Sequence, residues 1–281
     1  MIDIPTGMKA LKNKYLKYLI LGLISAVVVT FRPRKKQEIV AERDYPEIAA
    51  EGILRGVTEY NAISYYVEGD SLAGFYHDIF RAFARDKALK AELVPEMSFE
   101  KRLSGLRSGE FDVIAYGIPI TSEWKDSLLF TIPLAQTKQI LVQRKLNEED
   151  SIAINSQIDL AGKTLYVVKG SPAILRIHNL ANEIADTIYI HQIEDYGVEQ
   201  LIAMVAHGDI DFVVCEESIA QTMTDSLANI DISTGIGFTQ LYAWAVSKHS
   251  PELLDTLNHW LEDFIPSAEY KALYQRYYYK K

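Results

Sequence analysis

Cysteine is almost absent from this chain of 281 residues, in which Cys215 is the only one. An intramolecular disulfide therefore cannot form, and a structural zinc site built on several cysteines is excluded. The 6 histidines show no metal-ligand spacing, so we expect neither a metal site nor a cofactor. A single cysteine is compatible with either redox compartment, because a body of about 240 residues buries enough core without disulfides.

Catalytic motifs are also missing. The sequence contains no G-x-S-x-G, no phosphate-binding glycine loop and no dinucleotide fingerprint. Carboxylates are plentiful, but no pair of them is marked for acid–base chemistry by its spacing. We therefore expect a non-enzymatic protein with no catalytic residues.

Positive charge is scarce over most of the chain. Residues 1–40 carry a balance of +6 and residues 41–281 a balance of −15, within a formal net charge of −9. Nucleic-acid binding rests on neutralising phosphates with lysine and arginine, so the acidic body excludes a nucleic-acid partner. With 48% hydrophobic and 24% charged residues, the composition is that of a folded globular protein.

A long hydrophobic run is lacking as well. The uncharged run Tyr18–Phe31 has 14 residues and is flanked by clusters of lysine and arginine. A membrane span needs about 17–25 residues, and residues 15–31 are long enough only if Lys17 extends to the headgroups. A buried core helix is the alternative, which the flanking cations disfavour.

No cleavage site of small residues follows this run, and no cysteine is available there for lipid attachment. We interpret residues 1–40 as a cytoplasmic stub and an uncleaved signal anchor, followed by a linker at residues 41–51. The body would then lie on the periplasmic face of the inner membrane, or free in the periplasm if the segment is cleaved.

From residue 53 onward, short apolar runs alternate with helical periodicity, which predicts βαβ units and mainly parallel sheets. The order helix, glycine, acidic residue and apolar strand occurs twice, at residues 106–114 and 204–214. This repetition indicates two α/β lobes of related build. The predicted strands are residues 53–58, 91–95, 112–116, 139–142, 164–168, 211–215 and 241–246, and the predicted helices are residues 75–89, 98–108, 171–184, 198–206, 251–264 and 268–278.

Candidate binding residues follow the predicted strands, where ligands bind in open α/β sheets. Gly170 and Ser171 precede a helix whose N-terminus favours an anionic ligand group, although a plain helix cap explains them too. Glu216 can accept a hydrogen bond from a ligand amine or hydroxyl; the alternative is a carboxylate that stabilises a helix dipole.

Tyrosines gather between the first predicted strand and the first predicted helix. Tyr60, Tyr65 and Tyr66, together with Trp124, are expected to form an aromatic wall. Aromatic faces suit sugar rings, peptide side chains or amines, and packing between the lobes is the alternative. The tyrosines of residues 270–279 have helical spacing instead, which predicts a helix face that packs on the body.

Four stretches carry a resemblance to a known family. Residues 72–124 resemble the first lobe of family 3 extracellular solute-binding proteins, with the helix start GFYHD and the helix-to-strand join LRSGEFD. Residues 159–175 (DLAGKTLYVVKGSPAIL) are similar to the family's second-lobe opening. Residues 208–220 (GDIDFVVCEESIA) and 269–278 (EYKALYQRYY) are similar to its later strand and closing helix.

This resemblance, over about residues 52–279, implies a two-lobed type II periplasmic-binding-protein fold that closes on a ligand held between α/β lobes. It places lobe 1 at residues 52–140 plus 240–281 and lobe 2 at residues 141–239. The residues that it and the strand ends indicate for ligand binding are Tyr60, Asn61, Tyr65, Gly117, Pro119, Thr121, Trp124, Gly170, Ser171 and Glu216.

Two departures from the family pattern bear on the ligand. Amino-acid-binding members hold the ligand carboxylate with an arginine where this chain has Trp124, and a tryptophan has no bidentate donor for a carboxylate. Gly117 is followed by Ile118 and Pro119, where a hydroxyl is usual. We therefore expect a ligand other than a free α-amino acid.

The chain is also similar to the non-catalytic N-terminal domain of membrane-bound lytic transglycosylase F. That similarity favours a peptide or muropeptide ligand and a wall-remodelling enzyme as partner. An amino-acid receptor that serves an ABC permease is the main alternative, and a periplasmic dehydratase-like enzyme on the same fold is the third.

Overall fold

The computed structural model describes residues 43–145 and 154–279. The predicted anchor at residues 15–31 lies outside these ranges. Within them, no helix has the length and apolar character needed to cross a membrane.

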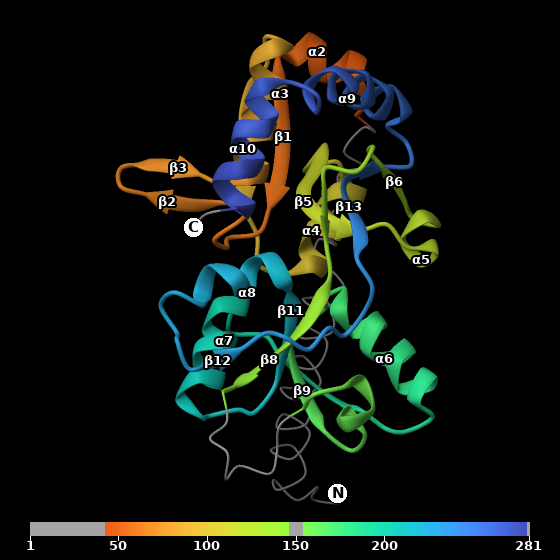
Figure 1. The fold of residues 1–281 in the computed structure, drawn as a ribbon. Helices are drawn as coiled ribbons and strands as arrows, with labels where there is room; N and C mark the ends of the chain where they lie inside the picture. Colours follow the sequence, from red (N-terminus) through yellow and green to blue (C-terminus); the bar gives the residue numbers. More distant parts are fainter. Residues whose placement is uncertain (1–42, 146–153, 280–281) are drawn as a thin grey trace, which may run out of the picture. The chain divides into compact units, whose positions relative to one another are not determined.

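A mixed sheet forms the centre of the first α/β unit, which we call lobe 1 (Figure 1). Its strand order is β4-β1-β5-β13-β6, and β7 pairs with β13 beside this path. Strands β1, β4 and β5 are parallel, whereas β13 runs antiparallel to β5 because the chain re-enters the sheet from the other lobe. The strands are β1 Ile53–Thr58, β4 Lys90–Pro95, β5 Val113–Pro119, β6 Leu128–Phe130, β7 Ala135–Thr137 and β13 Gln240–Ser247.

Helices pack on this sheet through amphipathic faces. Helix α3 buries Phe75, Ile79, Phe80 and Phe83, whose spacing predicts that face. Helix α10 packs on α3, with the rings of Phe75 and Tyr278 5.0 Å apart, so the predicted packing of the C-terminal tyrosines is confirmed. The helices are α2 Tyr45–Glu51, α3 Phe75–Asp86, α4 Phe99–Ser108, α5 Ser122–Lys125, α9 Pro251–Phe264 and α10 Ala268–Tyr278.

Helix α2 occupies most of the segment predicted as a linker, residues 41–51. Asp44 and Glu47 form a capping box at its start, and Gly52 ends it in the left-handed region at φ 76°. Ile48 is fully buried, and the Asp44 carboxylate also accepts hydrogen bonds from the first N–H groups of α9. The segment is therefore part of lobe 1.

A second sheet, of order β10-β9-β11-β8-β12, forms lobe 2 (Figure 1). Strands β9, β10 and β11 are parallel, and β8 runs antiparallel to β11. The strands are β8 Gln139–Arg144, β9 Thr164–Val168, β10 Tyr189–Ile193, β11 Val213–Glu216 and β12 Ile230–Asp231. The helices are α6 Ala173–Ile184, α7 Val198–His207, α8 Glu217–Met223 and the 3-10 turn at Gln157–Leu160.

Two crossings connect the lobes. The first lies at Lys138, between β7 of lobe 1 and β8 of lobe 2, and the second lies between Gly235 and β13. Strand β8 begins at Gln139, two residues before the predicted start of lobe 2 at residue 141. The repeated join of helix, glycine and strand occurs once in each lobe, with Gly109 after α4 and Gly208 after α7, both in the left-handed region.

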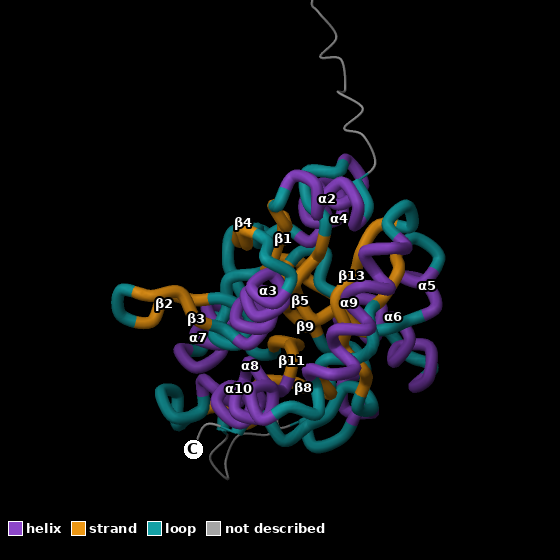
Figure 2. Tube along the Cα trace, turned by 90° about the horizontal axis from the view of Figure 1, so that it is seen from above, coloured by secondary structure: helices purple, strands orange, loops and turns teal. Residues whose placement is uncertain are grey.

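A two-stranded hairpin projects from lobe 1 (Figures 1 and 2). It consists of β2 Tyr66–Glu68 and β3 Ser71–Ala73, and it is not among the predicted elements. Each strand has only three residues, which is too short for an alternating pattern to emerge.

Candidate ligand-binding cleft

Side-chain hydrogen bonds join the lobes at the strand ends, in addition to the one between Gln139 and Tyr242 beside the crossings. The Tyr116 hydroxyl of β5 donates to Glu216 Oε1 at the end of β11, at 3.1 Å. The backbone N–H of Ala62 donates to Glu199 Oε1 near the start of α7, at 2.8 Å. The carboxyl ends of the central strands of both lobes therefore face a common cleft, as the fold predicts for a ligand site.

A cavity of about 40 Å³, which we call the cleft cavity, lies between these strand ends. Lobe 1 lines it with Glu59, Arg102 and Tyr116, and lobe 2 with Ser171 and Glu216. This volume suits about three water molecules, whereas small-molecule sites usually offer about 300–1,000 Å³. The cleft cavity is therefore too small for a whole ligand of that size.

Glu216 is the acidic group of lobe 2 in the cleft. Burial of its carboxyl, followed by the charge of the nearby Glu59, raises its pKa to about 8, although the Tyr116 hydrogen bond acts in the opposite direction. No cation pairs with Glu216 among the described residues. The arrangement accommodates a cationic ligand group, because such a group would stabilise the ionised carboxylate.

Arg102 and Glu59 form a buried ion pair that also lines the cavity. Arg102 Nη2 donates to Glu59 Oε2 at 2.8 Å, and Arg102 is 1% exposed. The guanidinium lies over the Tyr116 ring, 4.9 Å from its centre, and 5.4 Å from the centre of the Phe99 ring. Because Glu59 already neutralises Arg102, Glu216 is the ionisable group of the cleft cavity that has no counter-charge among the described residues.

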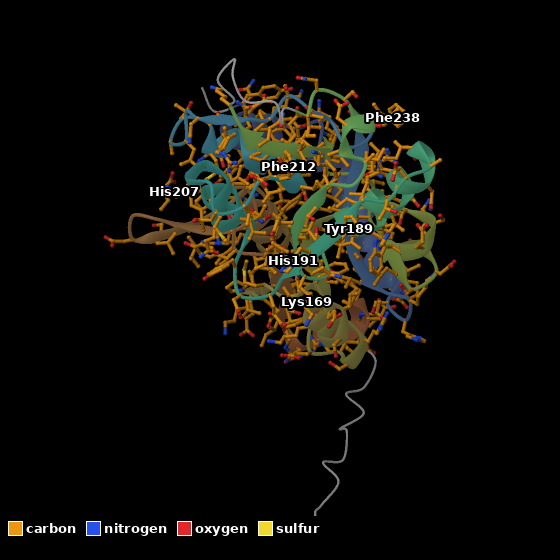
Figure 3. All side chains as sticks on the ribbon, turned by 90° about the horizontal axis from the view of Figure 1, so that it is seen from below. Lys169, Tyr189, His191, His207, Phe212 and Phe238 are labelled. Carbon is orange, nitrogen blue, oxygen red and sulfur yellow. The ribbon has the colours of Figure 1, made fainter. Side chains whose placement is uncertain are left out.

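A larger opening, the rim groove, continues outward from the cleft cavity, and Met97, Val168 and Lys169 line both. The groove has a volume of about 780 Å³, within the range of small-molecule sites. Tyr60 and Tyr196 line it and are about half exposed, so their rings are accessible. Figure 3 labels Lys169, which follows β9 and forms an ion pair with Glu194 at 2.9 Å.

The structure brings three of the predicted binding residues to these two openings. Ser171 and Glu216 line the cleft cavity, and Tyr60 lines the rim groove. The Ser171 hydroxyl accepts a hydrogen bond from the N–H of Ala173, where α6 begins two residues later than predicted. Gly170, directly before Ser171, adopts φ 71°, which turns the chain from β9 into the helix.

Other predicted residues have a supporting position. The Asn61 side chain accepts from the N–H groups of Ile63 and Ser64 and so closes the turn after β1. Tyr65 is 8% exposed and packs edge-on against Tyr60. These two residues shape the loop that presents Tyr60 and do not line either opening.

The remaining predicted residues belong to the strand β5 and the turn after it. Gly117 and Pro119 are buried in β5, and Thr121 precedes α5. Trp124 packs edge-on against Phe99, with ring centres 5.1 Å apart. None of these four lines the cleft cavity or the rim groove.

Arg102, Tyr116 and Gln139 line the cleft cavity but are not among the residues predicted from the sequence. Arg102 does carry a signal, because it occupies the apolar stripe of α4 at three residues after Phe99 and four before Leu106. A charged residue on a buried helix face needs a partner, and that requirement marks it for attention.

We expect Gly117→Ala to destabilise the protein by about 2–3 kcal/mol. A Cβ at this position would lie 2.1 Å from Oη of the buried Tyr76, so the strand or the tyrosine must shift. Gly235→Ala is the matched control, since its Cβ would meet nothing nearer than 3.7 Å. Urea unfolding midpoints measure both, and equal midpoints for the two variants would contradict the steric account.

A sequence match over most of the chain shows the family to which it belongs. Residues 55–280 match the bacterial extracellular solute-binding proteins, family 3. The chain belongs to that family. The predicted resemblance is therefore confirmed.

Curated relatives of this family 3 protein include proteins named membrane-bound lytic murein transglycosylase F. The protein from Desulfosudis oleivorans is 28% identical over 233 residues, which cover 83% of this chain and 50% of the relative. The protein from Idiomarina loihiensis is 23% identical over 240 residues, covering 84% and 50%. The chain thus spans about half the length of these relatives.

Solved structures confirm the two-lobed fold of this family member. A mutant of ArgBP from T. maritima superposes with a TM-score of 0.72 at 23% identity, covering 84% of this chain and 99% of that protein. An ancestral arginine-binding protein bound to arginine gives a TM-score of 0.70 at 27% identity, covering 81% and 98%.

Proposed function

We propose that this chain is a non-enzymatic extracytoplasmic receptor that closes its lobes on a small polar ligand bearing a protonated amine, of the peptide or peptidoglycan-fragment class. The observation that carries this proposal is Glu216, a carboxyl group at the lobe interface with no cationic partner in the described ranges and a pKa of about 8. A ligand ammonium beside Glu216 would stabilise the ionised carboxylate and so supply the counter-charge that this form lacks.

The dimensions of the site support a ligand larger than one amino acid. The cleft cavity accepts only a small head group, while the rim groove of about 780 Å³ adjoins it through shared walls. Tyr60 and Tyr196 offer apolar faces along this groove, and Lys169 and Glu194 offer polar groups. An amine in the cavity and an extended polar body in the groove fit this arrangement.

The relatives support the same ligand class. Membrane-bound lytic murein transglycosylases act, by their name, on murein, and this chain matches about half of their length. We propose that this chain recognises fragments of that polymer and acts with a wall-remodelling enzyme. The membrane anchor at residues 15–31 is part of this proposal and rests on the sequence alone.

An amino-acid receptor for an ABC importer is the second candidate. The ancestral arginine-binding proteins at 27% and 28% identity favour it, since one is bound to arginine and the other to glutamine. The tryptophan at position 124 disfavours it, because Trp124 offers a ligand carboxylate no bidentate donor.

Dehydratase-like catalysis is the third candidate function. Turnover of a prephenate-type substrate would support it, provided that the substitution Glu216→Gln abolishes this turnover.

Thermal unfolding with added ligands separates the first two candidates. We expect the wall tripeptide L-alanyl-γ-D-glutamyl-meso-diaminopimelate to raise the unfolding temperature by more than any free amino acid at equal concentration, since only the binding of ligand to the folded state stabilises it. Strong stabilisation by one free amino acid and none by the tripeptide would overturn the ligand class. N-acetylglucosamine, which has no amine, is the control.

A further inference from the structure

Arg102 carries a donor that the fold leaves unused. Its Nη1 donates to the carbonyl oxygen of Glu96 at 2.5 Å and its Nη2 donates to Glu59 at 2.8 Å. Its Nε–H is buried and has no hydrogen-bond partner among the described residues. An unsatisfied buried donor of a charged group costs about 1–3 kcal/mol or more, so a native site that keeps one has a use for it.

Gln139 provides the complementary group on the same cavity. Its Nε2 donates to the Tyr242 hydroxyl at 2.9 Å, whereas its Oε1 is buried and has no partner within the described ranges. Both Arg102 and Gln139 line the cleft cavity. Two residues that line the cavity therefore carry one unpartnered donor and one unpartnered acceptor, both buried, in addition to the Glu216 carboxyl.

Tyr116 contacts both Arg102 and Glu216. Its ring lies against the Arg102 guanidinium, and its hydroxyl donates to Glu216. One tyrosine side chain thus separates the donor side of the cavity from the acidic side. A ligand that places its amine at Glu216 would reach the Arg102 side with an oxygen only a few bonds away.

We propose that Arg102 determines ligand specificity, by donating a hydrogen bond from Nε to a carboxylate or carbonyl oxygen of the ligand near its amine. This inference rests on the proposed function. Trp124 packs on Phe99, and the Arg102 guanidinium lies over the same Phe99 ring. Arg102 thus brings to the cavity, from helix α4, a guanidinium that position 124 lacks.

The variant Arg102→Lys tests this role. Lysine keeps a positive charge for Glu59 but places no N–H at the position of Nε. We expect its affinity for the wall tripeptide L-alanyl-γ-D-glutamyl-meso-diaminopimelate to fall by about 10- to 100-fold, the effect of losing one charge-assisted hydrogen bond. Its affinity for cadaverine, an amine without an oxygen acceptor, should change by less than about threefold. Isothermal titration calorimetry measures both.

Controls separate specificity from folding. Arg107→Lys, at an exposed position of the same helix, should leave both affinities unchanged. If Arg102→Lys does not fold, Glu59→Gln with Arg102→Met removes the ion pair as a unit and should lose the same preference for the tripeptide. If Arg102→Lys loses affinity equally for the tripeptide and for cadaverine, or loses affinity for neither, the role of Arg102 is overturned while the proposed function stands. Failure of the wild-type protein to bind either ligand overturns the proposed function and this inference together.

Discussion

Glu216→Gln is expected to stabilise the ligand-free protein by about 3 kcal/mol at pH 9, and by less than about 1 kcal/mol at pH 5. The pKa of Glu216 in the folded protein, about 8, lies above its ordinary value of 4.5. The favourable contribution of the protonated carboxyl is therefore complete below pH 4.5 and is lost as the pH rises through 8. The full shift corresponds to at most about 5 kcal/mol, and solvent screening reduces it because the Glu216 residue as a whole is only half-buried, although burial of its carboxyl dominates the shift.

Urea unfolding at pH 5, 7 and 9 measures this difference. Glu217→Gln is the control, because that carboxylate is partly exposed and pairs with Lys138 at 3.1 Å. Its effect on the free energy of unfolding should stay within about 1 kcal/mol at each pH. If the curves for wild type and Glu216→Gln run parallel from pH 5 to pH 9, the Glu216 carboxyl is not buried as the structure places it.

Arg102→Met is expected to lower the free energy of unfolding by about 3–5 kcal/mol. The substitution leaves Glu59, which is 8% exposed, as a buried carboxylate without its cation. It also removes the guanidinium from the faces of Phe99 and Tyr116. The loss is large because one partner of a buried pair remains, and not because the pair itself contributes much.

The double variant Glu59→Gln with Arg102→Met tests that reason. Because neither charge is then left alone, we expect it to recover more than half of the stability lost in Arg102→Met. Arg107→Met, at an exposed site of α4, serves as the matched single substitution and should cost less than about 1 kcal/mol. A double variant no more stable than Arg102→Met would show that packing, not the unpaired charge, explains the loss.

Periodicity in the sequence predicts the long elements of the fold closely. Helices α9 and α10 have the predicted bounds, since a proline opens α9, a serine caps α10 and each carries an amphipathic face. Strands β1 and β9 also have the predicted bounds. The hairpin β2–β3 and the edge strands β6, β7 and β10 were missed, because three to five residues at an edge carry little hydrophobic pattern.

Local sequence indicates only part of the site. Ser171 and Glu216, which line the cavity, were predicted because each follows a predicted strand. Neighbourhood along the chain is enough to recognise such a position. Arg102 and Tyr116 were not, because their place in the cleft depends on partners distant in sequence. Glu59 is 43 residues from Arg102, and Glu216 is 100 residues from Tyr116. Only the folding of both lobes brings these groups together.

Proton release on binding tests the central claim most directly. Isothermal titration calorimetry of the wall tripeptide at pH 7, in two buffers of different ionisation enthalpy, gives the number of protons released per ligand bound. Because the Glu216 carboxyl, with a pKa of about 8, is protonated before binding and ionised beside the ligand ammonium, wild type should release most of one proton and Glu216→Gln none. Binding by wild type with no proton release would contradict the account.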